Sequence, residues 1–173
     1  MTVKLKPFPA QDSTALNDLY AQVNQRYCLV HLPVPLPQEE TARYLEVIRT
    51  GNNAGQPFVC FGIYAEAVLI GKIELTRQDD GDAELDVVIR ESETGKGYGT
   101  QALGILLKEV YRRGWCRAVC AYVSRDNSHA RRMLTHAGFR QMRAFQADVM
   151  RWDGGSYRVE PQTGYEYIYY PQN

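Results

Sequence analysis

The sequence predicts a mixed α/β domain with a central, mostly antiparallel sheet of about seven strands and about four helices. Three patterns support this prediction. Residues 57–75 read as two strands joined by a tight turn. Residues 85–103 read as a strand, a glycine-rich loop and a helix. Apolar residues at three- and four-residue spacing mark amphipathic helices. No internal repeat or linker interrupts the chain, so we expect a single domain over residues 1–173.

The first half of the chain predicts, in order, a strand over 3–8, a helix over 13–23, an extended segment over 29–37, a helix over 38–50 and a hairpin of 58–64 with 67–75. Asp12 or Ser13 caps the first helix. Alternating prolines exclude a helix from the extended segment. Gly51 is expected to end the second helix, and Ala65-Glu66 forms the hairpin turn.

The second half predicts, in order, a strand over 83–90, a helix over 98–112, a strand over 117–123, a helix over 128–137 and strands over 139–150 and 157–170. An Asp-Asp-Gly-Asp turn precedes the first of these strands, and Asp-Gly-Gly joins the last two. Asn127 or Ser128 caps the helix over 128–137, and Gly138 terminates it.

Composition narrows the function classes. Lysine plus arginine equals aspartate plus glutamate, 20 each, so no overall charge favours nucleic acid or a membrane surface as partner. No apolar run is long enough for a transmembrane helix. The first residues lack the apolar core of a secretion signal, which favours the cytoplasm. The four cysteines include no Cys-x-x-Cys pair, so we expect reduced thiols and no metal site.

Gly95, Gly97 and Gly99 lie between a predicted strand and a predicted helix. Glycines let backbone N–H groups converge without interference from Cβ atoms, and a helix start adds amide groups and a positive dipole end. The loop is therefore a candidate seat for a phosphate or pyrophosphate. A Walker loop does not fit, because no Gly-Lys-Ser/Thr follows at the required spacing. Gly-x-Gly-x-x-Ala is present, but no βαβ unit of a nicotinamide dehydrogenase surrounds it. A glycine turn without a ligand stays an alternative.

Two motifs resemble those of the GNAT superfamily of acyl-CoA-dependent N-acetyltransferases. Residues 94–99, Thr-Gly-Lys-Gly-Tyr-Gly, are similar to the family's Q/R-x-x-G-x-G/A loop. Residues 127–139 are similar to N-x-x-A-x-x-L-Y-x-x-x-G-F. The chain's end resembles the ribosomal-protein and spermidine acetyltransferase branches. The resemblance implies splayed fourth and fifth strands, acetyl-CoA as donor, and transfer of the acetyl group to a primary amine by direct attack on the thioester.

The resemblance also implies where coenzyme A binds. The pantetheine arm would pair with the backbone of the fourth strand, and the pyrophosphate would lie on the glycine loop. The implied contacts are Val87, Val88, Ile89, Thr94, Gly95, Lys96, Gly97, Tyr98, Gly99, Thr100 and Asn127. Asn127 reads equally well as a plain helix cap. Thr94 stands where the family usually has arginine or glutamine, so that contact is either missing or supplied by Lys96 or Arg90.

Catalysis in such an enzyme needs a neutral amine and a proton for the departing thiolate. We predict Glu84 as the group that takes the amine proton, ahead of Glu74 and Asp86, although each also reads as a solvated strand residue. Leu134 stands where many family members have the tyrosine that protonates the thiolate. The candidates to replace it are Tyr122, which we favour among them, and Tyr98, Ser124 or a water molecule. Tyr122 also reads as a core aromatic without a catalytic role.

The acceptor is expected at a wall formed by residues 27–37, with Tyr27 and His31 as its polar points and Glu74 nearby. Acids around the cleft would attract a cationic amine, carried by a small molecule or a protein. Tyrosines near the C-terminus suggest a possible homodimer. Because of Leu134, a non-catalytic acyl-CoA-binding sensor is the alternative to an enzyme.

Overall fold

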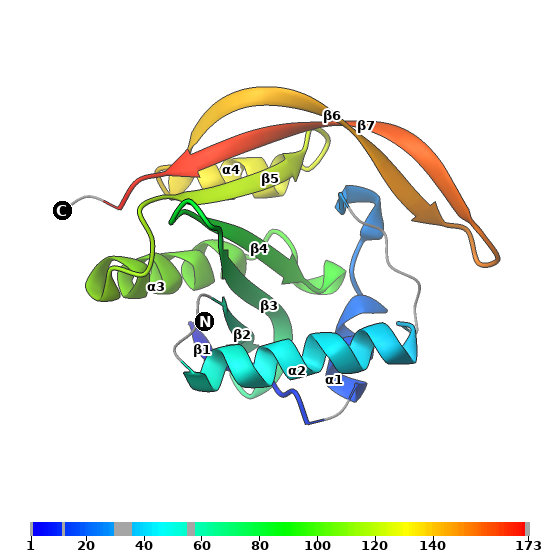
Figure 1. Ribbon diagram of the computed structural model, residues 1–173, viewed down its shortest axis with the longest axis horizontal. Coiled ribbons are helices and arrows are strands. Elements are labelled where there is room, and N and C mark those ends of the chain that lie inside the picture. Colours follow the sequence, from blue (N-terminus) through cyan, green and yellow to red (C-terminus); the bar gives the residue numbers. More distant parts are fainter. Residues whose placement is uncertain (1, 12, 30–35, 55–57, 172–173) are drawn as a thin grey trace.

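One seven-stranded sheet organises the protein, as Figure 1 shows for this computed structural model, which describes residues 2–11, 13–29, 36–54 and 58–171. Among these residues the strand order is β1-β2-β3-β4-β5-β7-β6, and only the β4–β5 pair is parallel. The strands are β1 (Val3–Pro7), β2 (Phe58–Ala65), β3 (Val68–Arg77), β4 (Ala83–Ile89), β5 (Val119–Ser124), β6 (Arg140–Trp152) and β7 (Tyr157–Tyr169). The predicted fold class is confirmed.

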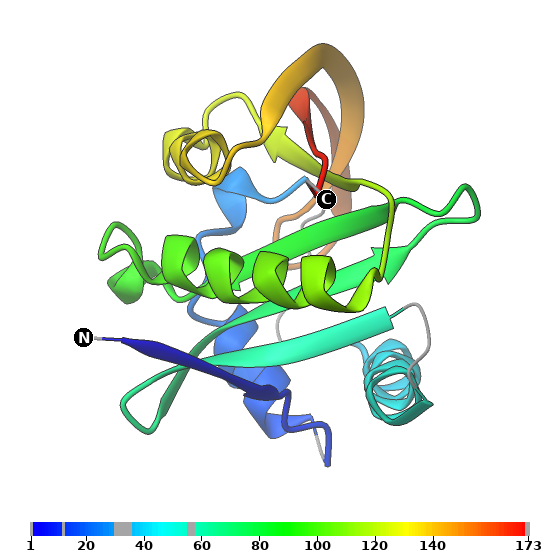
Figure 2. The ribbon, with the colours of Figure 1, turned by 90° about the vertical axis from the view of Figure 1, so that its left-hand side faces the viewer.

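In the described part of the chain, four α-helices cover the two faces of the sheet. They are α1 (Thr14–Tyr20), α2 (Gln38–Ala54), α3 (Tyr98–Arg113) and α4 (Ser128–His136), with single 3-10 turns η1 (Gln25–Tyr27) and η2 (Glu91–Glu93). The larger core lies beneath α3 and α4, where Leu103, Leu106 and Leu134 meet the sheet. Figure 2 shows α3 crossing in front of the strands. A smaller core joins α1 and α2 to the opposite face through Leu16, Ile48 and their neighbours.

The parallel pair β4–β5 holds together only at its beginning. Ala83 is in register with Val119 and Glu84 with Cys120, and the pairing ends there. Farther along, β4 continues against β3 and β5 continues against β7. The two strands therefore separate toward their carboxyl ends (Figure 1). This opening, the wedge, confirms the predicted splay of the fourth and fifth strands.

Two helix boundaries differ from the sequence prediction. Helix α2 continues through Gly51 to Ala54. A Cβ atom at Gly51 would lie 2.9 Å from Phe58, so this glycine serves the close approach of α2 to β2 and does not end the helix. Helix α1 stops at Tyr20, before Val23. There the chain turns, and the carbonyl of Gln22 accepts a hydrogen bond from the N–H of Glu91, 2.7 Å away.

Strands β6 and β7 form a long hairpin of 13 residues a strand. Its first part completes the sheet beside β5, while its far part reaches past the sheet toward the connection between α1 and α2 (Figure 1). The predicted Asp-Gly-Gly turn joins the strands, with the N–H of Asp153 donating to the carbonyl of Ser156. The hairpin thus places β6 residues close to a segment more than a hundred positions earlier.

Candidate active site

The edge of β4 carries backbone groups that point into the wedge. The N–H of Ala83 donates to the carbonyl of Ala118 on the β5 side, whereas the N–H of Arg90 donates to Ile70 on the β3 side. Because backbone groups alternate along a strand, those of Val87 and Ile89 face the wedge, as Ala83 does. Val87 and Ile89 have no paired residue in β5 within the described chain. They can pair with an extended ligand.

Val88 is placed differently from its two neighbours. A Cβ atom at Gly71 in β3 would collide with the Val88 carbonyl, so that carbonyl is directed at β3. The Val88 side chain is buried in the core beneath α1 and α2. Of the three β4 residues predicted to pair with a cofactor, Val87 and Ile89 therefore offer backbone groups to the wedge, and Val88 offers its groups to the neighbouring strand.

The glycine loop follows at the open end of the wedge. Gly95 and Gly97 have φ values of +84° and +80°, a region that residues with a Cβ atom rarely adopt. A Cβ atom at Gly97 would meet nothing within 4 Å, so the space beside it is open. Gly97 is the N-cap of α3, and the amides of Gly99 and Thr100 belong to its first turn. Such amides lack intrahelical partners and attract anions.

Other side chains surround this loop. Lys96 forms an ion pair with Glu93, with 3.0 Å between Nζ and Oε2, and the Thr94 hydroxyl donates to the carbonyl of Arg90 at 3.3 Å. Nε of Arg90 is buried and has no hydrogen-bond partner in the described part of the chain. His129, in the first turn of α4, lies 3.7 Å from the Cβ position of Gly95. Lys96 and Arg90 thus bring positive charge close to the loop.

Two residues of the second motif have clear structural roles. The side chain of Asn127 caps α4 by accepting a hydrogen bond from the N–H of Ala130 at 3.0 Å. Leu134 is buried in the larger core. The cap role of Asn127 is therefore present, and a contact from Asn127 to a cofactor stays a prediction. Leucine at position 134 serves packing and brings no proton donor to the site.

The two predicted catalytic residues lie on the same face of the sheet, on the two strands that separate. Residues of β4 and β5 alternate between the core beneath α3 and the other face. Glu84 and Tyr122 both lie on that other face, and Tyr122 is two positions beyond the residue in register with Glu84. The Tyr122 ring packs edge-on against Phe145 of β6, with 5.8 Å between centroids, and its side chain is 40% exposed.

The pKa values of both groups are raised. Partial burial raises the pKa of Glu84, and the negative charges of Asp86 and Glu74 raise it further. A carboxyl group with a raised pKa is a better proton acceptor. Burial, followed by the charge of Glu166, also raises the pKa of Tyr122. Tyr122 therefore keeps its proton at neutral pH, and the raised pKa makes it a weaker proton donor than a free tyrosine.

A buried lysine lies on this face, and sequence reasoning missed it. Lys72 of β3 is 1% exposed, and its Nζ lies 2.9 Å from Glu74 and 2.8 Å from Asp86. The rings of Tyr20 and Tyr44 face the ammonium group, with centroids 5.9 and 5.4 Å away. Burial alone would lower the pKa of Lys72, but the carboxylate of Asp86 and its neighbours raise it well above its usual value.

Glu74, predicted as a substrate contact, is a member of this ion cluster. Its side chain is engaged by Lys72 and by the hydroxyl of Tyr44, and only 13% of it is exposed. The Asp86 side chain is 50% exposed and forms the outward part of the cluster. The sequence signal for this cluster is a lysine within the apolar run of β3, two positions before an acid.

Of the predicted acceptor residues, Tyr27 lies in η1 and is half-buried, and His31 lies outside the described residues. The described part of the chain also outlines an open groove of about 750 Å³ between α3, the end of α4 and the end of β7. It reaches Thr100 but lies on the helix side of the sheet, away from Glu84 and Tyr122.

The described residues contain no group of three or more His, Cys, Asp or Glu side chains that could hold a metal ion. None of their helices is long and apolar enough to cross a membrane. The four cysteines form no disulfide in this part of the chain.

Several solved structures resemble this one. The ribosomal L7/L12 alpha-N-protein acetyltransferase RimL, in complex with coenzyme A, is 18% identical, with a TM-score of 0.78 over 98% of this chain and 94% of that chain. An acetyltransferase from Salmonella typhimurium that modifies the N-terminal serine of ribosomal protein L7/L12 is 16% identical, with a TM-score of 0.77 over 99% and 96%. The microcin C7 self-immunity acetyltransferase, in complex with acetyl-CoA and AMP, is 16% identical, with a TM-score of 0.73 over 98% and 92%.

These likenesses confirm the fold. Two of the three structures hold coenzyme A or acetyl-CoA, in agreement with the predicted donor. No curated protein matches the sequence significantly. The acetyltransferase (GNAT) domain family matches residues 2–140, which is most of the chain and includes the wedge and both motifs. The predicted enzyme class, an acyltransferase, is thereby confirmed, and the chain belongs to the GNAT acetyltransferase family.

Proposed function

We propose that this protein transfers an acetyl group from acetyl-CoA to a primary amine, by direct attack of the neutral amine on the thioester. The observation that carries the proposal is the wedge between β4 and β5. It has a glycine loop at its open end, and a carboxylate and a tyrosine lie on the strands beside it. Acetyl-CoA supplies the activated acetyl group, and the chain's own residues supply its seat and the proton transfers.

The donor seat fits the chemistry of coenzyme A. The positive φ of Gly97 and the open space beside it leave room for a phosphate group at the start of α3, where the amides of a first turn favour negative charge. The backbone groups of Val87 and Ile89 point into the wedge, where they can pair with the amides of a pantetheine arm. Lys96 and Arg90 lie beside the loop and can add positive charge.

The negative charge on the face of the sheet that carries Glu84 favours a cationic acceptor. Two carboxylates, Glu74 and Asp86, share the single ammonium group of Lys72, so the cluster keeps one net negative charge. Glu84 adds a second. Amines are mostly protonated in water at neutral pH, and a negative surface raises their local concentration. Since the similar RimL structures act on a ribosomal protein, a peptide α-amine is the first acceptor to test.

The reaction needs two proton transfers, and each has a candidate. Glu84 accepts the proton of the attacking amine, directly or through water, as the new N–C bond forms. The N–H groups of β4 that face the wedge stabilise negative charge on the thioester oxygen. When the C–S bond breaks, Tyr122 donates a proton to the sulfur. Tyr122 then regains a proton from solvent, and Glu84 releases its proton there, so the balance closes.

The test measures thiol release from acetyl-CoA with a panel of amines, with mass detection of the acetylated product. The panel contains a short peptide with N-terminal serine, spermidine and an aminoacyl nucleotide analogue. We expect turnover with at least one amine. Glu84→Gln should lower kcat by about 10²-fold or more, while the affinity for acetyl-CoA stays unchanged. Tight binding of acetyl-CoA without turnover on any amine would instead support a non-catalytic sensor.

A further inference from the structure

The segment that follows α1, residues 22–28, is held from two sides by distant elements. Residues 22–28, which include η1, lead into the predicted acceptor wall. On one side, the carbonyl of Gln22 accepts from the N–H of Glu91 at 2.7 Å. The amide of Asn24 donates to the Glu91 carboxylate at 2.8 Å. Glu91 lies in η2, directly after β4 and just before the glycine loop, so this first side is tied to the donor seat.

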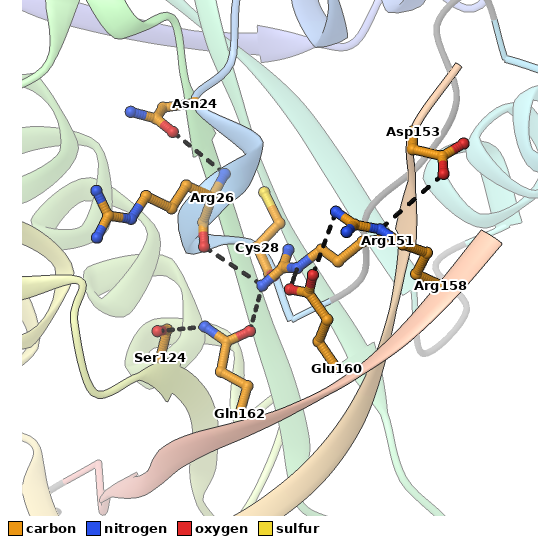
Figure 3. A network of polar contacts seen from close by, with 9 residues as sticks. All are labelled: Asn24, Arg26, Cys28, Ser124, Arg151, Asp153, Arg158, Glu160 and Gln162. Carbon is orange, nitrogen blue, oxygen red and sulfur yellow. Dashed lines mark hydrogen bonds and ion pairs between the residues drawn. The ribbon is translucent and has the colours of Figure 1, made fainter. Parts of the chain in front are cut away.

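On the other side, one arginine of the β6–β7 hairpin holds the segment. Nη1 of Arg151 donates to the carbonyl of Cys28 at 2.9 Å, and Nη2 donates to the carbonyl of Arg26 at 3.4 Å. The Arg151 side chain is 13% exposed and lies 3.8 Å from the carboxylate of Glu160. Figure 3 shows the guanidinium group between the backbone of Cys28 and the side chain of Gln162.

Gln162 extends these contacts to β5. Its carbonyl oxygen accepts from Arg151, and its amide donates to the hydroxyl of Ser124 at 2.5 Å. Ser124 is the last residue of β5 and is 1% exposed. The carbonyl of Ser124 accepts from the N–H of Asn127, the cap of α4. A continuous line of hydrogen bonds thus runs from residues 26–28 through β6 and β7 to the β5 side of the wedge (Figure 3).

The held segment lies close to the acidic cluster. Burial raises the pKa of the Cys28 thiol to about 11, and among nearby charges Asp86 raises it further while Arg151 and Lys72 lower it. The segment begins two positions after Tyr20, whose ring centroid lies 5.9 Å from Nζ of Lys72 on the face that carries Glu84, so the geometry also places it near this cluster. Residues 22–28 consequently border the place where the proposed acceptor would approach the wedge.

We propose that Arg151 is a positioning residue for acceptor binding: it fixes residues 26–28 as one wall of the acceptor site. The proposal rests on the proposed function. A planar guanidinium group suits this task because it presents several donors in a fixed geometry, here to two backbone carbonyls and one side-chain amide. The hydrogen bonds and the ion pair given above for Arg151 go to residues 26–28, Gln162 and Glu160. We therefore expect its replacement to affect the acceptor wall more than the donor seat.

The first test follows the reactivity of Cys28 and needs no substrate. Labelling with iodoacetamide at pH 8 is followed by mass spectrometry of the cysteine peptides. In Arg151→Met we expect Cys28 to react about tenfold faster or more, because two hydrogen bonds from a charged donor are lost. The lost positive charge on its own would slow the reaction by raising the thiol pKa, so faster labelling reports release of the segment. Arg151→Lys, which can serve one carbonyl, should be intermediate.

Two controls separate local release from general unfolding. Cys60 is buried in the core beneath α1 and α2, and its labelling should not change. Arg158→Met removes a neighbouring arginine of the same hairpin that is 63% exposed and pairs with Glu160 and Asp153. It should label like the wild type. Unchanged labelling of Cys28 in Arg151→Met, or an equal rise at Cys60, overturns the proposal.

The second test separates acceptor from donor, with the N-terminal-serine peptide as acceptor probe. Arg151→Met should raise the KM for the peptide about tenfold or more, while the KM for acetyl-CoA changes by less than about twofold. A parallel rise of both KM values overturns the proposal, because it indicates a general structural role. If the wild type acetylates no amine, the proposed function fails, and the labelling of Cys28 still decides whether Arg151 holds the segment.

Discussion

Replacing Lys72 by methionine is expected to destabilise the protein strongly, because the change removes the cation of a buried ion cluster. Lys72 is 1% exposed and serves both Glu74 and Asp86. Breaking a buried ion pair by removing one partner costs about 3–5 kcal/mol. Here Asp86 is half-exposed and can regain water, and the hydroxyl of Tyr44 still donates to Glu74. We therefore expect a loss near the lower end, about 3 kcal/mol.

Urea unfolding at pH 7 measures this loss as a shift of the midpoint at constant slope. Lys108→Met, a change at an exposed lysine of α3, is the control and should stay within about 0.5 kcal/mol of the wild type. In the double variant Lys72→Met with Glu74→Gln the uncompensated buried charge is gone. Much of the lost stability should therefore be regained. A Lys72→Met variant as stable as the control would refute the view that this cluster is tightly coupled.

The stability difference between the wild type and Lys72→Met is also expected to follow a defined course with pH. The pKa of Lys72 is raised in the folded protein, so its contribution to stability is fully present below the unfolded pKa of about 10.4. The contribution is lost as pH rises through the folded pKa. The stability difference between wild type and Lys72→Met should therefore be the same at pH 7 and pH 9.

Three further predictions concern the site. Asp86→Asn removes a negative charge that raises the pKa of Glu84, so the acid limb of kcat/KM should move to lower pH; a limb at unchanged pH would count against Glu84 as the base. Gly97→Ala and Gly97→Glu share the strain of a positive φ, about 1–2 kcal/mol, but only the glutamate variant places a negative charge at the phosphate seat. Calorimetry should detect binding of coenzyme A to the alanine variant and none to the glutamate variant. Leu134→Tyr should lower stability by about 1–3 kcal/mol through overpacking of the core, measured by thermal unfolding, and a faster turnover in this variant would show that a proton donor was lacking.

Much of the fold could be predicted from the sequence because its signals are local. Strand alternation, the aspartate-glycine turns and the cap at Asn127 each act within a few residues, and the structure places them as expected. Gly51 misled the prediction for a physical reason. A glycine inside a helix reads as a terminator, but this one is required by the approach of Phe58. That contact depends on tertiary packing, which local patterns do not report.

The site was predictable in the same uneven way. The glycine loop is contiguous in sequence, so its role as a phosphate seat follows from spacing alone. The wedge depends on where pairing between β4 and β5 stops, and only the family resemblance indicated it. The clusters around Lys72 and Arg151 join residues from separate elements. The hydrogen bond from Arg151 to Cys28 spans 123 positions, and no periodicity in the sequence connects two such residues.

The acidic face gives one physical cause for two needs of the proposed reaction. An acceptor amine arrives mostly protonated, so the surface near the wedge must attract a cation. The same amine must then lose its proton, so the base must hold a proton well. The charges of Asp86 and Glu74 serve both needs, since they attract the cation and raise the pKa of Glu84. Lys72 limits the effect, because without its ammonium group two carboxylates would repel each other across a buried part of the sheet.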